Sequence, residues 1–128
     1  MKRILSLLSL LLLTALTSFA APMKARVIQP LFAQDREGLD KSFEWTLRAL
    51  EKCNKSLDIV VLPEFSEVPG ATPQPEDFLK IAREYGPTLL QKCSETARRC
   101  STLVFCGAID TECEVPRNAT FVYGRDGR

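Results

Sequence analysis

The chain has 128 residues, of which 45% are hydrophobic and 26% are charged, and its formal net charge is +1. This length allows at most one small domain after a leader, and the composition is ordinary for a globular protein. A near-neutral charge with no basic stripe gives no electrostatic case for a nucleic-acid partner, so none is expected.

The first residues have the pattern of a secretory signal peptide. Two basic residues precede an apolar run that ends at Leu13, and small residues follow up to Ala20. A membrane anchor is the competing interpretation, but polar residues interrupt the run, which is shorter than the roughly 20 apolar residues that span a bilayer. We therefore expect residues 1–20 to be a signal peptide cleaved after Ala20, and residues 21–128 to form a secreted or periplasmic domain without a stable membrane anchor.

Export would place the five cysteines in an oxidising compartment, where disulfides persist. The odd count leaves at least one cysteine unpaired within the chain. Cys93 and Cys100 are expected on one helix, where their spacing separates them by roughly 10 Å along the axis, too far to bridge. The pairing of the other cysteines stays open.

The first half of the domain has the pattern of a βαβ unit. Residues 24–32 predict an opening strand with Pro30 at its exit. Asp35 could cap a helix, and apolar residues recur at helical spacing over 38–53. The nearly continuous apolar run over 57–62 predicts a strand buried on both faces. This order predicts a right-handed crossover and parallel strands.

The second half is expected to hold a loop, two helices and two strands. Residues 65–75 contain too many prolines and glycines for a regular element and predict a surface loop, with Glu67 as an ordinary acid of that loop. The Gly86-Pro87 pair predicts an interruption between two helices. The remaining expected elements are helices over 76–85 and 88–100, a buried strand over 102–109, and an antiparallel strand over 118–123.

Glu64 is the residue of most interest because it follows directly on the buried strand and Pro63. In an open α/β sheet the carboxyl ends of the strands border the ligand crevice, where a general base is useful. A solvated carboxylate at a strand end is the simpler alternative. Position alone does not decide between the two interpretations.

Several motifs together favour the catalytic interpretation. Gln29-Pro30, the segment 58–64, the strand segment 105–108 and Asn118-Ala119-Thr120 follow in an order and spacing that resembles the amino-terminal portion of the carbon-nitrogen hydrolase (nitrilase and aliphatic amidase) superfamily. The resemblance covers nearly all of the chain after the leader, and its most specific piece is the strand ending on Pro63-Glu64. It implies an α/β fold that is part of an α-β-β-α sandwich.

The resemblance also implies a chemistry, the hydrolysis of a small amide or nitrile through a cysteine thioester. Glu64 matches the general base, which takes the proton of the thiol and later activates water. The family's oxyanion-stabilising Lys and nucleophilic Cys would both fall beyond Arg128. The resemblance thus implies an incomplete domain that is inactive alone, no cofactor or metal, and a possible homo-oligomer of the complete protein.

Other chemistries find little support in the residues present. The chain has no histidine and no C-x-x-C pair, which excludes Ser-His-Asp and Cys-His catalysis and the common zinc sites within it. Cys106 is expected to be a buried structural thiol, and two flanking acids argue against Cys113 as a nucleophile. Asn118 opens an expected buried strand and is predicted to have a hydrogen-bonding role. The rival function is a secreted non-catalytic α/β module whose loop over 66–75 binds a partner.

Overall fold

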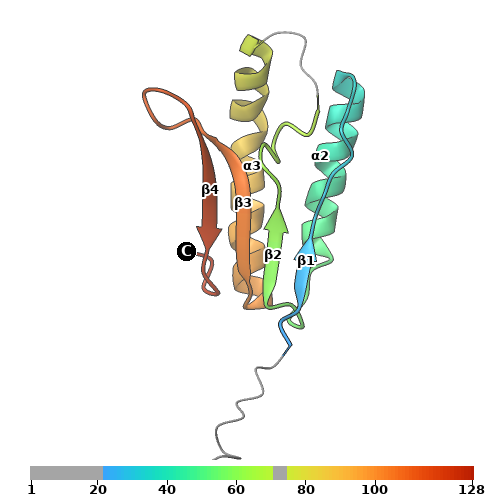
Figure 1. Ribbon diagram of the computed structural model, residues 1–128, viewed down its shortest axis with the longest axis vertical. Coiled ribbons are helices and arrows are strands. Elements are labelled where there is room, and N and C mark those ends of the chain that lie inside the picture. Colours follow the sequence, from blue (N-terminus) through green and yellow to red (C-terminus); the bar gives the residue numbers. More distant parts are fainter. Residues whose placement is uncertain (1–21, 71–74) are drawn as a thin grey trace, which may run out of the picture.

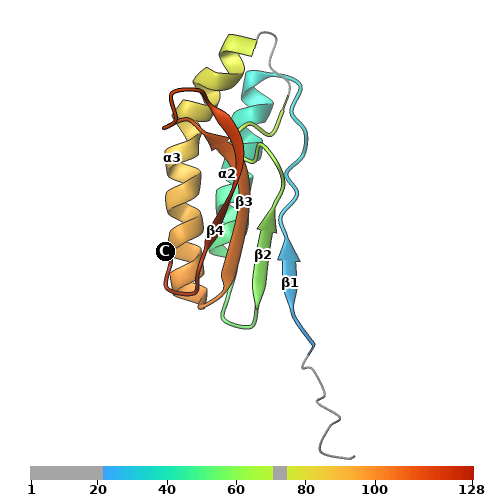
Figure 2. The same ribbon diagram turned by 60° about the vertical axis from the view of Figure 1, so that its left-hand side comes forward.

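The computed structural model describes residues 22–70 and 75–128, so the predicted signal peptide lies outside the described residues. One four-stranded sheet has the order β1-β2-β3-β4, and the two helices α2 and α3 cover the same face of it, as Figures 1 and 2 show. The elements are β1 (Ala25–Val27), α2 (Arg36–Glu51), β2 (Ile59–Leu62), α3 (Pro75–Cys100), β3 (Leu103–Asp110) and β4 (Arg117–Tyr123). This α/β architecture confirms the predicted fold class.

The strand directions confirm the expected βαβ order. β1 and β2 are parallel, β2 and β3 are parallel, and β4 returns antiparallel to β3. β1 is shorter than predicted, although Ile28 continues its pairing by donating its N–H to the Val61 carbonyl at 2.9 Å. The carboxyl ends of the three parallel strands therefore lie at one edge of the sheet.

Helix α2 begins where the sequence predicts, because Asp35 accepts a hydrogen bond from the Gly38 N–H at 2.7 Å. Its buried face carries Leu39, Phe43 and Leu50. The Phe43 ring stacks on Tyr85 of α3 with centroids 4.2 Å apart. A capped helix with one apolar face is thus held against both the sheet and its neighbouring helix.

The predicted break at Gly86-Pro87 is wrong, because α3 is one helix that contains Pro87. A proline inside a helix removes one backbone hydrogen bond and commonly bends the helix. Figure 2 shows the first turns of α3 tilted from the rest. The apolar positions Leu89, Cys93 and Ala97 are fully buried beyond the proline, and this packing offsets the lost bond.

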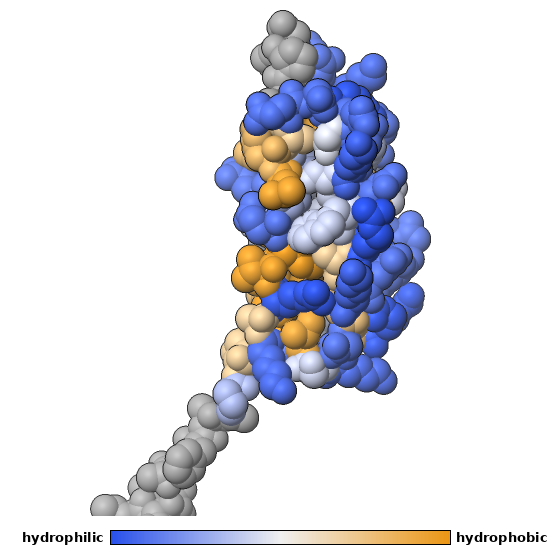
Figure 3. Space-filling view, turned by 90° about the vertical axis from the view of Figure 1, so that its right-hand side faces the viewer, coloured by the Kyte–Doolittle hydropathy of each residue, from blue (hydrophilic) through white to orange (hydrophobic). Residues whose placement is uncertain are grey.

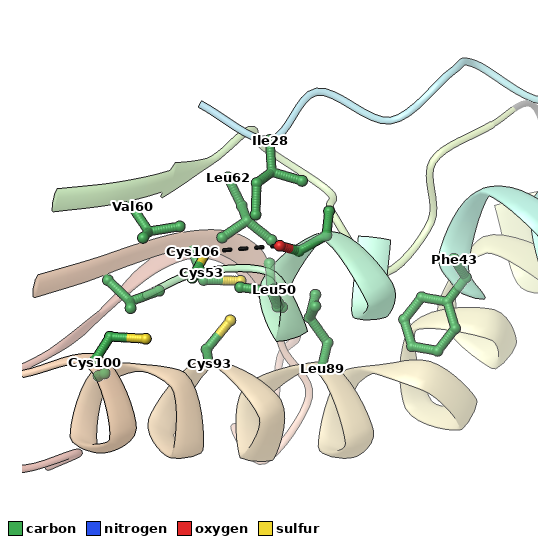
Figure 4. Packing of buried hydrophobic residues seen from close by; sticks show 14 residues of the cluster. Ile28, Phe43, Leu50, Cys53, Val60, Leu62, Leu89, Cys93, Cys100 and Cys106 are labelled. Carbon is green, nitrogen blue, oxygen red and sulfur yellow. Dashed lines mark hydrogen bonds between the residues drawn. The ribbon is translucent and has the colours of Figure 1, made fainter. Parts of the chain in front are cut away.

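The main core lies between the sheet and the two helices. Its buried side chains lie on β2, β3 and both helices or next to these elements, and Phe121 and Tyr123 of β4 pack against them. Four cysteines, Cys53, Cys93, Cys100 and Cys106, lie in this core among leucine and valine side chains (Figure 4). All five cysteines are free thiols in the structure, and Cys113 is the one that is not buried. Cys106 is fully buried, as expected from its apolar neighbours.

A hydrogen-bonded clasp joins α2 to α3 on the surface. The Tyr85 hydroxyl donates to the Asp40 carboxylate, and Arg36 contacts Asp40 at 2.9 Å and Glu84 at 2.7 Å. Burial and the Asp40 carboxylate raise the pKa of Tyr85 to about 12, so its hydroxyl stays protonated and can donate at neutral pH.

The other face of the sheet is uncovered by the described residues. Along β2, Val60 and Leu62 are buried under the helices, whereas Ile59 and Val61 point the other way and are half-buried. The side formed by β1 and α2 also exposes apolar groups among polar ones (Figure 3), including Val27, which is 70% exposed. None of the helices within 22–70 and 75–128 has the length and apolarity needed to cross a membrane.

Candidate active site

Glu64 lies two residues past the end of β2 and its side chain is exposed at the carboxyl edge of the sheet. It stands on the rim of an open concavity of about 650 Å³ on the uncovered face. The lining residues are Ile59, Val61, Leu62, Glu64, Phe105, Gly107, Asn118 and Thr120. Glu64 also borders a smaller cavity of about 180 Å³. The predicted base is therefore accessible to a small molecule.

Asn118 is brought to Glu64 by the pairing of β4 with β3. Its Nδ2 donates a hydrogen bond to Oε1 of Glu64 across 54 positions of sequence. The prediction of a buried strand at this point is wrong, because β4 is an edge strand and Asn118 is exposed. Its expected hydrogen-bonding role is confirmed, and the amide holds the carboxylate that it contacts.

Gly107 allows β3 to pass directly beneath the turn that carries Glu64. A Cβ at this position would lie 2.6 Å from the Pro63 carbonyl oxygen and 2.7 Å from the Glu64 Cα. Any larger residue would push the turn away from the strand. The Gly107 carbonyl also accepts a hydrogen bond from the Ser66 N–H at 3.0 Å.

The backbone after Glu64 takes a restrained conformation. Phe65 has a φ of +55°, in the left-handed region that residues other than glycine rarely adopt. Ser66 fixes the turn from the other side by donating its hydroxyl to the Pro63 carbonyl at 2.5 Å. Strained residues of this kind persist only where the surrounding structure holds them, and they cluster at functional sites.

The prediction of a surface loop is wrong for the residues that follow Phe65. Ser66 and Glu67 are fully buried and Val68 is 3% exposed, whereas residues 71–74 lie outside the described part. Glu67 is thus no ordinary loop acid. Its Oε1 accepts the Ile109 N–H at 2.6 Å, its Oε2 is buried without a partner in the described residues, and burial raises the pKa of the carboxyl. Sequence reasoning missed this residue because the prolines and Gly70 masked the burial.

None of the thiols with a resolved pKa shift is activated for attack. Burial raises the pKa of Cys53, and the contact with the Cys106 thiol, together with burial, raises that of Cys93. The pKa of Cys113 is raised by its hydrogen bond to Asp110, at 3.1 Å. Cys106 is fully buried on the helix-covered side of the sheet, away from the concavity.

The described chain holds one member of the expected triad near the concavity, Glu64. Lys80 is exposed on α3, and Lys92 forms an ion pair with Glu51 at 2.7 Å on the helical side of the molecule. Within residues 22–70 and 75–128, no cluster of three or more His, Cys, Asp or Glu side chains is arranged to hold a metal ion.

Comparison with solved structures identifies several carbon-nitrogen hydrolases with the same fold. A carbon-nitrogen hydrolase from Helicobacter pylori G27 is 19% identical with a TM-score of 0.56, and the match covers 83% of this chain and 36% of that chain. The NitFhit protein of C. elegans is 21% identical with a TM-score of 0.55, covering 81% of this chain and 25% of that one.

An amidase from Nesterenkonia sp. AN1 is 13% identical with a TM-score of 0.53, and the match covers 83% of this chain and 41% of that chain. That structure is a glutamate-to-glutamine variant that shows Michael addition of acrylamide at the active-site cysteine. No protein-family model matches this sequence, and no curated protein matches it. These likenesses show that the chain has part of the carbon-nitrogen hydrolase fold and spans less than half of the solved chains it resembles.

Proposed function

We propose that this chain is the amino-terminal part of an exported carbon-nitrogen hydrolase that cleaves small amides or nitriles, with Glu64 as its general base. The observation that carries the proposal is the exposed Glu64 carboxylate at the end of a parallel strand, hydrogen-bonded by Asn118 on the rim of the open concavity. The fold shared with an amidase that has an active-site cysteine supports the same chemistry.

In the proposed mechanism Glu64 removes the proton from a cysteine thiol as the thiolate attacks the carbonyl or nitrile carbon. With an amide, the carboxyl then returns the proton to the nitrogen, which leaves as ammonia. With a nitrile, the proton goes to the nitrogen of a thioimidate, and a first water adds before ammonia leaves. In both cases the carboxyl later activates the water that hydrolyses the thioester. Asn118 would hold the carboxylate in place during these transfers. The proposal assigns the attacking Cys and an oxyanion-stabilising Lys to sequence that follows Arg128 in the complete protein.

Ammonia release by the complete protein tests the proposal. The reading frame that contains this chain is expressed in full and incubated with short aliphatic amides, aliphatic nitriles and N-carbamoyl amino acids. We expect saturable ammonia release from at least one compound, and its loss in the Glu64→Gln variant. Saturable binding of such compounds without ammonia release would instead favour the non-catalytic module.

The export part of the proposal has a separate test. We expect the mature protein recovered outside the cytoplasm to begin at Ala21, as determined by amino-terminal sequencing. An intact amino terminus in a membrane fraction would indicate an anchor and contradict export as a free protein.

A further inference from the structure

Glu67 is a buried carboxyl that the proposed mechanism does not use. It lies three residues after Glu64 and is fully shielded from solvent, whereas Glu64 is exposed. A buried carboxyl is costly unless it is hydrogen-bonded. Oε1 of Glu67 accepts one hydrogen bond, from the Ile109 N–H, and Oε2 has no hydrogen-bond partner among the described residues. Burying this carboxyl costs free energy, and its place in the turn that carries Glu64 suggests what it contributes in return.

The hydrogen bond of Glu67 continues the bonding along one edge of β3 past the point where its pairing with β2 ends. Ser66 donates to the Gly107 carbonyl and Glu67 accepts from the Ile109 N–H. Gly107 and Ile109 are two positions apart, so their backbone polar groups point to the same edge of the strand. The turn after Glu64 is therefore fastened to β3 at two successive points.

The other edge of β3 leads back to Glu64. Ile109 pairs with Asn118 of β4, and Asn118 donates to the Glu64 carboxylate. Glu67 is thus linked to Glu64 in two ways, through the two intervening residues Phe65 and Ser66 of the restrained turn and across the Ile109–Asn118 pair. Together the two connections form a closed loop of contacts that contains the buried Glu67 carboxyl and the exposed Glu64 carboxylate.

We propose that Glu67 is a positioning residue, whose carboxyl fixes the Ile109–Asn118 pair and the turn at Phe65 and thereby sets where the Glu64 carboxylate lies. This inference rests on the proposed function of Glu64 as a base. A displacement of about 1 Å at a reacting group can cost roughly a hundredfold in rate, so a positioning contact of this kind affects kcat more than KM.

Two variants of Glu67 in the complete protein separate hydrogen bonding from packing. Glu67→Gln keeps the acceptor oxygen and the volume, and we expect its kcat on the most active amide of the panel to stay within about threefold of wild type. Glu67→Leu fills the space without an acceptor, and we expect kcat to fall at least about tenfold with KM changed less than about twofold. Glu67→Met replaces the leucine variant if leucine prevents folding.

A double-mutant cycle with Asn118→Ala tests whether Glu67 acts through the pair. We expect Glu67→Leu to lower kcat by a smaller factor in the Asn118→Ala background than in wild type, because one of the two connections is already lost there. Equal kcat for the Gln and Leu variants, or full additivity in the cycle, would overturn the positioning role. The Glu64→Gln variant separates the two hypotheses. If Glu64→Gln keeps wild-type activity, the proposed function is wrong. If Glu64→Gln loses activity and Glu67→Leu keeps it, only the positioning role of Glu67 is wrong.

Discussion

At the scale of single residues, Glu64 and Glu67 have the same side chain in one short turn and opposite environments. Glu64 faces solvent and accepts from Asn118, whereas Glu67 is buried and accepts from the Ile109 backbone. The positive φ of Phe65 between them turns the chain inward. One acid is thus available for proton transfer and the other is confined to a structural contact.

The burial of Glu67 leads to a prediction about pH and stability. Because burial raises its pKa in the folded state, the folded protein favours the protonated carboxyl. Its favourable contribution is fully present below the usual glutamate pKa of 4.5 and is lost as pH rises through the raised value. We expect Glu67→Gln, which cannot ionise, to resist urea better than wild type at pH 7.

The same comparison at pH 4 is the control, since wild-type Glu67 is then mostly protonated in both states. The difference in urea midpoint between the two proteins should shrink there. A difference that is independent of pH would show that the carboxyl is not titrating in the way its burial requires.

Tyr85 provides a second prediction, on the clasp between the helices. Tyr85→Phe keeps the ring that stacks on Phe43 but removes the hydroxyl that donates to Asp40. We expect a loss of about 1 kcal/mol in the free energy of unfolding, measured by urea titration. Tyr123→Phe is the matched control, because burial and the neighbouring thiols, with no hydrogen bond from the described residues, raise the pKa of that hydroxyl, and it should have the smaller effect.

At the scale of elements, the sequence predicted a helix or strand correctly wherever a single capping residue or a single hydrophobic periodicity determines it. The Asp35 cap, the apolar face of α2 and the parallel run of β2 were all predictable. Tertiary packing decided the rest. Pro87 remains helical because buried side chains beyond it hold α3 on the sheet, and the turn after Glu64 is buried because β3 binds its backbone.

Asn118 shows the same limit at the candidate site. The sequence predicted Glu64 at a strand end and a hydrogen-bonding Asn118, but their meeting depends on the register of β4 against β3. A one-residue slip would move Asn118 to the opposite face of the sheet. Register of this kind is set by packing and cannot be read from either segment alone.

A substitution at Gly107 tests the close contact between β3 and the turn that carries Glu64. Gly107→Ala introduces a Cβ against the Pro63 carbonyl and the Glu64 backbone, which must shift. We expect a loss of about 1–3 kcal/mol in the free energy of unfolding of the complete protein, and a fall in kcat of at least about tenfold. Urea titration and steady-state ammonia release measure the two effects.

Gly86→Ala is the control for this substitution. A Cβ at Gly86, within α3, meets nothing within 4 Å among the described residues. We expect it to change the free energy of unfolding by less than about 1 kcal/mol, because the helix preference of alanine is opposed by contact of its Cβ with the Pro87 ring, and to leave kcat unchanged. Equal losses in the two variants would show that the close approach at Gly107 does not matter.

At the scale of the whole molecule, the sheet has one face under helices and one face uncovered. Ile59, Val61 and Phe105 line the open concavity, and Val27 on the edge strand β1 is 70% exposed. Unpaired edges and apolar faces favour association with other chains. The chain also spans less than half of the solved structures it resembles.

We therefore expect the isolated segment 21–128 to be marginally folded or self-associating, and to release no ammonia from amides or nitriles. Thermal unfolding and analytical ultracentrifugation measure the first property. A cooperative transition in a monodisperse monomer would contradict it and favour an independent module. Saturable hydrolysis by this segment that is lost in Cys106→Ala would show that the active site is elsewhere than at Glu64.

The kcat of Glu64→Gln in the complete protein tests the central claim most directly. Glutamine keeps the size and accepts from Asn118 but cannot take a proton, and general bases contribute roughly 10²- to 10⁴-fold. We predict a fall of at least about a hundredfold with an unchanged melting temperature, while Glu114→Gln, at an exposed acid between β3 and β4, retains most activity. Equal and small effects of the two substitutions would make Glu64 an ordinary surface acid and contradict the hydrolase assignment.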